Sequence, residues 1–371
     1  MLKRILKKPT TAIFMALLFG FIAGAIVLLI AGYHPLEVYA VLFKTVFSKP
    51  KYLAQILVNA APIILTGLAV AFAYNTGLFN IGAEGQYMVG AIVAAMMGHY
   101  LPLPPVIHPL LILIVAFVLA GLLAALAAWL KNRFGIHEVI STIMLNWIVF
   151  YLHNFIVNQP SIKVSGTVHS PEIRQSASLL FFSKDYLRSP EGQAFLGSSP
   201  FLRDILRTAL SWGIPLAITV ALIYWFLLKK TRFGYGLRAV GLNKYAAEFS
   251  GIPVQKNVFY SMFLAGGAAG LAGAVVILSY GLYISALGAQ EGYGWDGISV
   301  SLIAQANPIA CVFTGILFAF LRFGGQLVQA RTQTPTEIIN IMIGAIVLAI
   351  AVASLLPRLA DYLERKEKSN A

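Results

Sequence analysis

Four polar side chains lie within twelve residues of an otherwise apolar part of the sequence. They are two asparagines, a glutamate and a glutamine: Asn75, Asn80, Glu84 and Gln86. Amides and carboxylates can bind a polar solute, and at membrane depth such groups are costly and commonly line a path. Glycines between them free the backbone from helical geometry. We predict that residues 74–86 form a broken helix or re-entrant turn facing such a path. The alternative is an ordinary turn with Glu84 solvated.

A second polar array precedes a later apolar run. It comprises Gln290, Glu291, Trp295 and Asp296, among glycines at positions 288, 292, 294 and 297. Transporters often contain inverted repeats whose discontinuous helices build a site near the bilayer midplane. If the two halves of this chain form such a pair, the two arrays would be counterparts on opposite sides of the membrane. Trp295 and Asp296 therefore join the candidates for the path.

A third segment, GYGLRAVGLNKYAAEFSGI at residues 234–252, mixes small and charged residues between two long apolar runs. One irregular apolar face of a short helix could carry Leu237, Val240, Tyr245 and Phe249. Ala246 and Ala247 would permit close approach, which suits docking into a groove of another protein. A basic loop without a partner is the alternative.

The elements that must position these residues are membrane helices. Of the 371 residues, 59% are hydrophobic and 11% charged, and the mean hydropathy of +0.80 lies outside the range of soluble domains. Lys and Arg fall between apolar runs rather than in one stripe with aromatic residues, which argues against nucleic-acid binding despite a net charge of +13. We predict an all-α polytopic membrane helix bundle, in which an inverted repeat is one option, forming one domain over residues 1–371.

Seven apolar runs are long enough to cross the hydrocarbon core of a bilayer. They cover residues 12–31, 53–74, 109–130, 139–157, 209–228, 258–282 and 338–356. Residues 86–101 form a shorter run. Another, at 298–321, is interrupted by Gln305, Asn307 and Pro308, which would leave backbone groups unsatisfied in lipid. We predict two short or broken helices there, and hence about ten spans.

Basic residues near both ends of the sequence predict that both termini are cytoplasmic. These residues are Lys3, Arg4, Lys7 and Lys8, and Arg358, Arg365, Lys366 and Lys368. Ten spans give the even number of crossings that this orientation requires. The polar residues 158–208 then form an outside loop, and residues 229–257, with six basic side chains, form a cytoplasmic loop.

Other residues within the runs predict helix packing. Polar side chains there favour interhelical hydrogen bonds over substrate contacts: Asn59, Asn146, His153 and Asn154. The glycine-rich residues 266–273 and the pair Gly20 and Gly24 permit close helix crossing, within the chain or between two chains. Cys311 lies in an apolar run and predicts an inert packed thiol.

Two of the segments above resemble one family. The sequence GLRAVGLNKYAAEFSGI resembles the cytoplasmic coupling segment of permease subunits of bacterial ABC importers, in the branch serving ribose, branched-chain amino acids and nucleosides. The sequence LTGLAVAFAYNTGLFNIGAEGQYMVGA, residues 65–91, resembles nucleoside-type permeases that work with a basic membrane lipoprotein receptor. The likeness covers about residues 53–356. The GIDLS signature of ribose-type members is absent, which favours nucleosides.

The resemblance implies a transmembrane permease subunit that forms the translocation pathway and couples to a separate ATPase. Its coupling residues would be Arg238, Gly241, Asn243, Ala246, Ala247, Glu248 and Gly251. The implied partners are that ABC ATPase, a second permease subunit, an extracellular substrate-binding lipoprotein and the nucleoside substrate. The implied location is the inner or plasma membrane of a bacterial cell, embedded in the lipid bilayer.

The sequence contains no Gly-Lys dipeptide and therefore no phosphate-cradling P-loop. We expect ATP and Mg²⁺ to be bound by the partner ATPase, no cofactor or metal in this chain, and no enzyme activity of its own. Three alternatives remain: an importer permease for a simple sugar or branched-chain amino acid, an ion-coupled secondary transporter using Glu84 or Asp296, and a non-transporting scaffold. The exact substrate, and whether the paired permeases are identical, are left open.

Overall fold

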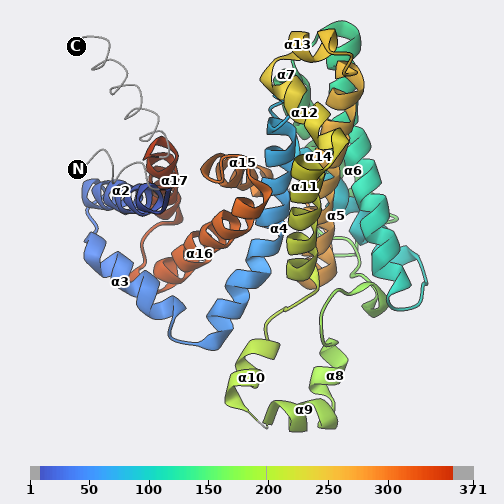
Figure 1. Cartoon of the computed structure of the whole chain (residues 1–371). Coiled ribbons are helices and arrows are strands. Elements are labelled where there is room, and N and C mark those ends of the chain that lie inside the picture. The colour runs from blue at the N-terminus through green and yellow to red at the C-terminus, as the bar shows by residue number, and fades with distance from the viewer. Residues whose placement is uncertain (1–8, 198, 354–371) are drawn as a thin grey trace, which may run out of the picture. The chain divides into compact units, whose positions relative to one another are not determined.

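The computed structural model describes residues 9–197 and 199–353, and it is helical along most of them (Figure 1). Within these ranges, β pairing is limited to two isolated antiparallel bridges, His169 with Ser285 and Leu180 with Ser211. The prediction of an all-α polytopic bundle is confirmed. The basic residues near the two termini, which predicted a cytoplasmic location, lie outside the described residues.

Six helices are long and apolar enough to cross a membrane. They are α4 (Pro50–Tyr74), α6 (Ile107–Phe134), α7 (Glu138–Val157), α11 (Gly213–Lys230), α14 with the π-helical turn that follows it (Val254–Gly281), and α16 (Pro308–Thr332). The remaining predicted runs are occupied by α2 (Pro9–Ile30), α5 (Ala83–Tyr100), α15 (Tyr293–Ile303) and α17 (Thr336–Ala353). Parts of α2 and α17 are apolar helices shorter than a full span, whereas α5 and α15 occupy predicted runs without meeting the same criteria, so six of the about ten predicted spans are present as full-length candidates among the described residues.

The predicted interruption of the run at 298–321 is present. Helix α15 ends at Ile303, α16 begins at Pro308, and both Gln305 and Ala306 between them have positive φ angles. A proline is well accommodated at the first position of a helix, because that residue needs no hydrogen bond from its backbone nitrogen. The two helices extend beyond the predicted limits, since α15 already begins at Tyr293 and α16 continues to Thr332.

The chain divides into two compact units, which are described separately. The described residues of the first are 9–52 and 320–353. In it, α2 packs against α17, and a Cβ atom at Gly20 would meet the backbone of Ile346 at 2.9 Å. Helix α3 (Pro35–Val46) follows α2, and Tyr39 donates a hydrogen bond to the carbonyl of Phe21. The predicted close crossing at Gly20 is therefore confirmed, within the chain.

The second unit is Leu53–Ala319, and its centre is α14 packed between α5 and α6. The glycine-rich stretch of α14 makes this possible: Gly270 approaches Ala116 and Ala120 of α6, and Gly273 approaches the Tyr87 carbonyl of α5. Residues 266–273 are thus packing residues, as predicted, and their contacts lie within this chain. Helix α4 is almost completely buried from Ala60 to Ala73.

Two irregular regions of the second unit carry shorter helices. Residues 158–208 contain the 3₁₀ turn Gln175–Ala177, then α8 (Lys184–Arg188), α9 (Pro190–Gly197) and α10 (Pro200–Leu206), which follow one another in an arc before α11 (Figure 1). Between α11 and α14 lie α12 (Arg232–Leu242) and α13 (Lys244–Phe249). The loop residues 158–208 and 229–257 predicted from the sequence correspond to these regions.

Candidate transport site and coupling surface

The turn between α4 and α5 is held by a pair of buried amides. Asn80 donates to the Gln86 side-chain oxygen at 2.8 Å, and Gln86 donates back to the Asn80 oxygen at 2.9 Å. The same Asn80 oxygen accepts from the backbone nitrogen of Gly82. Asn80 is 0% exposed and Gln86 2% exposed. Both predicted path residues therefore bind each other and fix the start of α5.

Asn146 of helix α7 also holds this turn through two hydrogen bonds. Its side-chain oxygen accepts from the backbone nitrogen of Gly85 at 2.8 Å, and its amide donates to the carbonyl of Ile81 at 2.9 Å. Gly85 lies so close that an added Cβ atom would meet the Asn146 backbone at about 3.0 Å. The predicted structural role of Asn146 is confirmed.

Glu84 connects the two polar arrays directly. Its two carboxylate oxygens accept from the backbone nitrogens of Gly292 at 2.7 Å and Gly294 at 2.6 Å, and the side chain is fully buried. Gly294 packs so closely that a side chain there would clash with the Glu84 backbone. A solvated Glu84 is therefore wrong. So is the prediction that the two arrays lie on opposite sides, because a hydrogen-bonded pair cannot be separated by the membrane.

The first two residues of the second array, Gln290 and Glu291, belong to a non-helical segment that runs beside α7, whereas Trp295 and Asp296 lie in the first turn of α15. Near the end of α7, His153 contacts the carbonyl of Ser285 at 2.9 Å, and Asn154 bonds both the nitrogen and the oxygen of Leu287. These contacts show why the sequence places polar side chains in α7. The structure assigns them to the protein's own backbone, in agreement with the predicted packing role.

This segment reaches well along α7. Asn154 holds Leu287, whereas Asn146, eight residues earlier, holds the turn that carries Glu84 and, through it, Gly292. Eight residues of α-helix correspond to about 12 Å. The non-helical segment therefore descends along a helix that is itself a candidate span. Non-helical backbone at membrane depth persists only where protein buries it or where it lines water.

Aromatic side chains gather where this segment enters α15. Tyr87 and Tyr293 stack with ring centroids 4.8 Å apart, and the hydroxyls of Tyr280 and Tyr293 lie 3.1 Å apart. Trp295 is 43% exposed and donates its ring N–H to Gln290 at 3.1 Å, while Asp296 is half-buried. Sequence reasoning selected the tryptophan and missed the three tyrosines. Their separation along the chain gave no signal, because only the folded contacts bring them together.

The remaining predicted path residue, Asn75, lies at the other end of α15. Its amide donates to the carbonyl of Ala306 at 2.8 Å and also to that of Ala71. Along its length α15 packs on α4, where Gly67 approaches Val300 and Gly297 approaches Thr66. Each predicted path residue of residues 74–86 thus contacts protein, and those in the turn position α15.

The segment at 234–252 forms two helices rather than one. Asn243 ends α12 and caps α13, because its side-chain oxygen accepts from the backbone nitrogens of Tyr245 and Ala246. Gly251, with φ of 78°, closes α13 in the left-handed conformation that glycine adopts readily. The sequence predicted one short helix and did not identify this cap.

The apolar residues of this segment point two ways. Leu237 and Val240 are buried within the chain, whereas Leu242, Tyr245 and Phe249 are exposed, Phe249 to 96%. The predicted single apolar face is therefore wrong. We call the three exposed residues the coupling surface.

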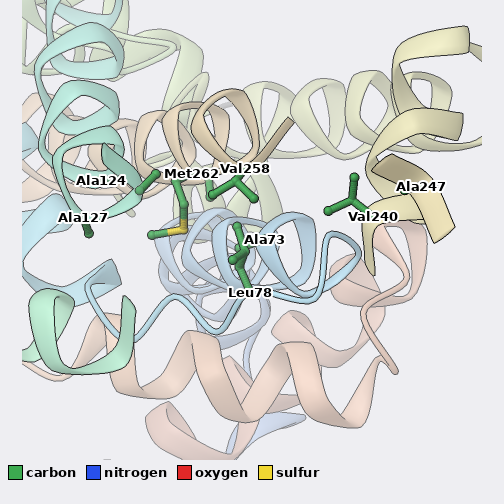
Figure 2. Packing of buried hydrophobic residues seen from close by; sticks show 10 residues of the cluster. Ala73, Leu78, Ala124, Ala127, Val240, Ala247, Val258 and Met262 are labelled. Carbon is green, nitrogen blue, oxygen red and sulfur yellow. The ribbon is translucent and has the colours of Figure 1, made fainter. Parts of the chain in front are cut away.

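Ala247 is also buried, at 4% exposure, in a cluster with Val240, Val258 and other residues (Figure 2). Its small size is explained by packing inside this chain, and a bulky side chain there would disturb this packing. Ala246 and Glu248 are exposed, and Arg238 is half-buried.

The fold and the site together define a class: a multi-pass helical membrane protein in which polar side chains hold a non-helical segment against a candidate span. The chain matches the family described as branched-chain amino acid transport system, permease component, over residues 52–351, and it belongs to that family. It is accordingly a permease subunit of an ABC importer.

Named relatives agree along most of their length. The guanosine ABC transporter permease of Bacillus subtilis is 35% identical over 95% of this chain and 96% of its own. The nucleoside ABC transporter permease of Lactococcus lactis is 31% identical over 91% of this chain and 89% of its own. The glucose ABC transporter permease of Haloferax volcanii is 27% identical over 90% and 85%, respectively.

The buried amide pair yields a first prediction. Asn80→Ala should lower the free energy of unfolding by about 1–3 kcal/mol, because Gln86 and the nitrogen of Gly82 lose their buried partner. Thermal unfolding of the purified protein in detergent measures this. Gln255→Ala removes an exposed amide at the start of α14 and should change little. Equal stability of the two variants would contradict the structural role of the pair.

Proposed function

We propose that this chain is a nucleoside-importing permease subunit of a bacterial inner or plasma membrane. The observation that carries the proposal is the end-to-end similarity to a permease whose name specifies guanosine. A second relative is named for nucleosides in general. Family membership removes the ion-coupled secondary transporter and the scaffold from the alternatives.

The substrate path follows the non-helical segment at 287–292 and the first turn of α15. Gly288 is exposed, and no atom lies within 4 Å of the position where a side chain of Gly288 or Gly292 would begin. Non-helical backbone within the membrane must be buried by protein or line a water-filled space, because lipid offers no hydrogen-bond partner. Discontinuous helices of this kind are where transporters place their sites. Trp295, Asp296 and the neighbouring tyrosines supply aromatic and polar groups suited to a base and a sugar. Asn75, Asn80, Glu84 and Gln86 support that path from behind.

The coupling surface is the docking site for a separate ATPase, which binds ATP and Mg²⁺. Leu242, Tyr245 and Phe249 are exposed large apolar residues on two short helices outside the candidate spans. Clusters of this type mark interaction sites. Basic residues around them, including Lys244, favour the cytoplasmic side of the membrane, where ATP is available.

Residues 158–208 form the outer docking region for a substrate-binding lipoprotein, and a second permease completes the pathway. This topology yields a second prediction. A cysteine replacing the exposed Ala194 should react with an impermeant thiol reagent added outside intact cells, whereas one replacing Ala246 should react only after the membrane is opened. The native Cys311 is fully buried and should stay silent. The reverse labelling pattern would overturn the orientation.

The function is tested by uptake into proteoliposomes. The chain is reconstituted with an ABC ATPase, a second permease and a substrate-binding lipoprotein from the same organism, and radiolabelled guanosine uptake is followed with and without ATP. ATP-dependent uptake that unlabelled nucleosides suppress supports the proposal. Suppression of the uptake by unlabelled glucose but not by unlabelled nucleosides would favour a sugar importer, the alternative that the similarity to the Haloferax glucose permease supports. The absence of ATP-dependent guanosine uptake would refute the nucleoside assignment.

A further inference from the structure

The coupling segment meets the turn between α4 and α5 backbone to backbone. A side chain on Gly241 would clash with the carbonyl oxygen of Asn75, and it would come within 3.0 Å of the nitrogen of Gly77. In return, a side chain on Gly77 would lie 3.2 Å from the Cα atom of Gly241. Both positions are glycine, and Gly77 has a φ of 72°, which other residues adopt rarely. Only two glycines allow this approach.

Gly241 also lies next to the coupling surface. Val240 before it is buried in the same cluster as Leu78, the residue after Gly77, and Leu242 after it is 88% exposed. Figure 2 shows Val240 on the ribbon of α12 and Leu78 on the turn that follows α4. The contact with the turn and the surface proposed for the ATPase are therefore made by adjacent residues, Gly241 and Leu242.

The turn in question holds both ends of α15. At the carboxyl end, Asn75 donates to Ala306, which has a positive φ angle in the link to α16. At the amino end, Glu84 accepts from Gly292 and Gly294. Residues 75–84 are therefore hydrogen-bonded to both ends of α15, the helix that carries Trp295. A displacement of residues 75–84 would shift α15 as a whole, because the hydrogen bonds at its two ends would move together.

We propose that Gly241 and Gly77 are positioning residues for transport: their contact carries displacement of the coupling segment into residues 75–84 and thus to α15. This rests on the proposed coupling role of the segment. Chains of packed groups and rigid elements in contact can carry coupling between distant parts of a protein. Two backbones in direct contact form such a connection without a flexible side chain between them.

The test uses the full complex in proteoliposomes with the Gly241→Ala permease. We expect the ATPase to remain bound, and the number of nucleosides taken up per ATP hydrolysed to fall about tenfold, a typical size for a lost coupling. Gly236→Ala is the matched control, because it adds the same methyl group to α12 beside the side chain of Asn257 instead of a backbone. A purely structural role would lower uptake and hydrolysis in proportion, and an unchanged ratio would overturn the proposal.

Asn75→Ala provides a second variant that removes volume instead of adding it. It breaks the bond to Ala306 and should lower the same ratio, so the proposal stays testable if Gly241→Ala fails to assemble. Because the two residues act in series, their combined effect should be smaller than the sum, whereas Gly236→Ala and Asn75→Ala should be additive. The inference would be overturned if the effects of Gly241→Ala and Asn75→Ala were additive in the double variant. It would also be overturned if Asn75→Ala alone left the number of nucleosides taken up per ATP hydrolysed unchanged. Failure of the wild-type complex to import nucleosides would instead refute the proposed function.

Discussion

Glu84→Gln is expected to abolish most nucleoside uptake while leaving the protein inserted in the membrane. Both carboxylate oxygens accept backbone hydrogen bonds, from Gly292 and Gly294. Glutamine keeps one acceptor but turns an N–H group toward the other donor. Hydrogen bonds to charged groups contribute about 1.5–3 kcal/mol each. Losing one detaches the start of α15, and the helix that carries Trp295 is no longer fixed.

Three variants, each tested for ATP-dependent uptake and for its melting temperature, separate this effect from a general loss of folding. ATP-dependent uptake should fall more steeply in Glu84→Gln than the melting temperature does, and Glu84→Ala, which loses both bonds, should lower both further. Glu337→Gln is the matched control, because Glu337 also lies in the first turn of a helix but is exposed. Wild-type uptake by Glu84→Gln would show that a carboxylate is not required at the contact between the arrays.

The helices were predictable from the sequence because the membrane imposes a length and a composition on each span. Even the break near Pro308 followed from its chemistry, since a proline and two polar residues cannot continue a helix in lipid. The start of α15 did not follow. Gly292 and Gly294 look like helix breakers, but Glu84, far away in the chain, accepts their hydrogen bonds and allows a helix to begin there.

The candidate site was only partly predictable for a related reason. Polar residues near 80 and 290 could be recognised as functional, because polar groups at membrane depth require an explanation. Their partners could not be assigned, since the Asn80–Gln86 and Glu84–Gly294 bonds depend on how helices pack. Periodicity likewise placed Val240 and Phe249 on one face, and the cap at Asn243 turned them apart. Local patterns identify residues that need a partner, and tertiary contacts decide which one.

Phe249→Asp is expected to release the ATPase from the purified complex and thereby eliminate ATP-driven uptake. Phe249 is 96% exposed at the end of α13, so it adds little to the stability of this chain. We expect Phe249 to be a hot spot of this interface, that is, one of the few residues whose truncation costs at least about 2 kcal/mol of binding free energy. Aspartate goes further, because docking would also require an unpaired charge to be buried. Co-purification of the ATPase with tagged permease, followed by titration of its affinity, measures the loss.

Phe201→Asp is the matched control, because it makes the same substitution on a different surface of the protein. Phe201 is an exposed aromatic residue on α10, in the region proposed to face outward, and its replacement should leave the ATPase bound. Phe249→Leu should restore much of the affinity, since it keeps an apolar side chain without a charge. Unchanged melting of Phe249→Asp would show that the fold is intact. If that variant held the ATPase as firmly as Phe201→Asp, the exposed apolar residues of α12 and α13 would face something other than the ATPase, and coupling would have to enter the bundle elsewhere.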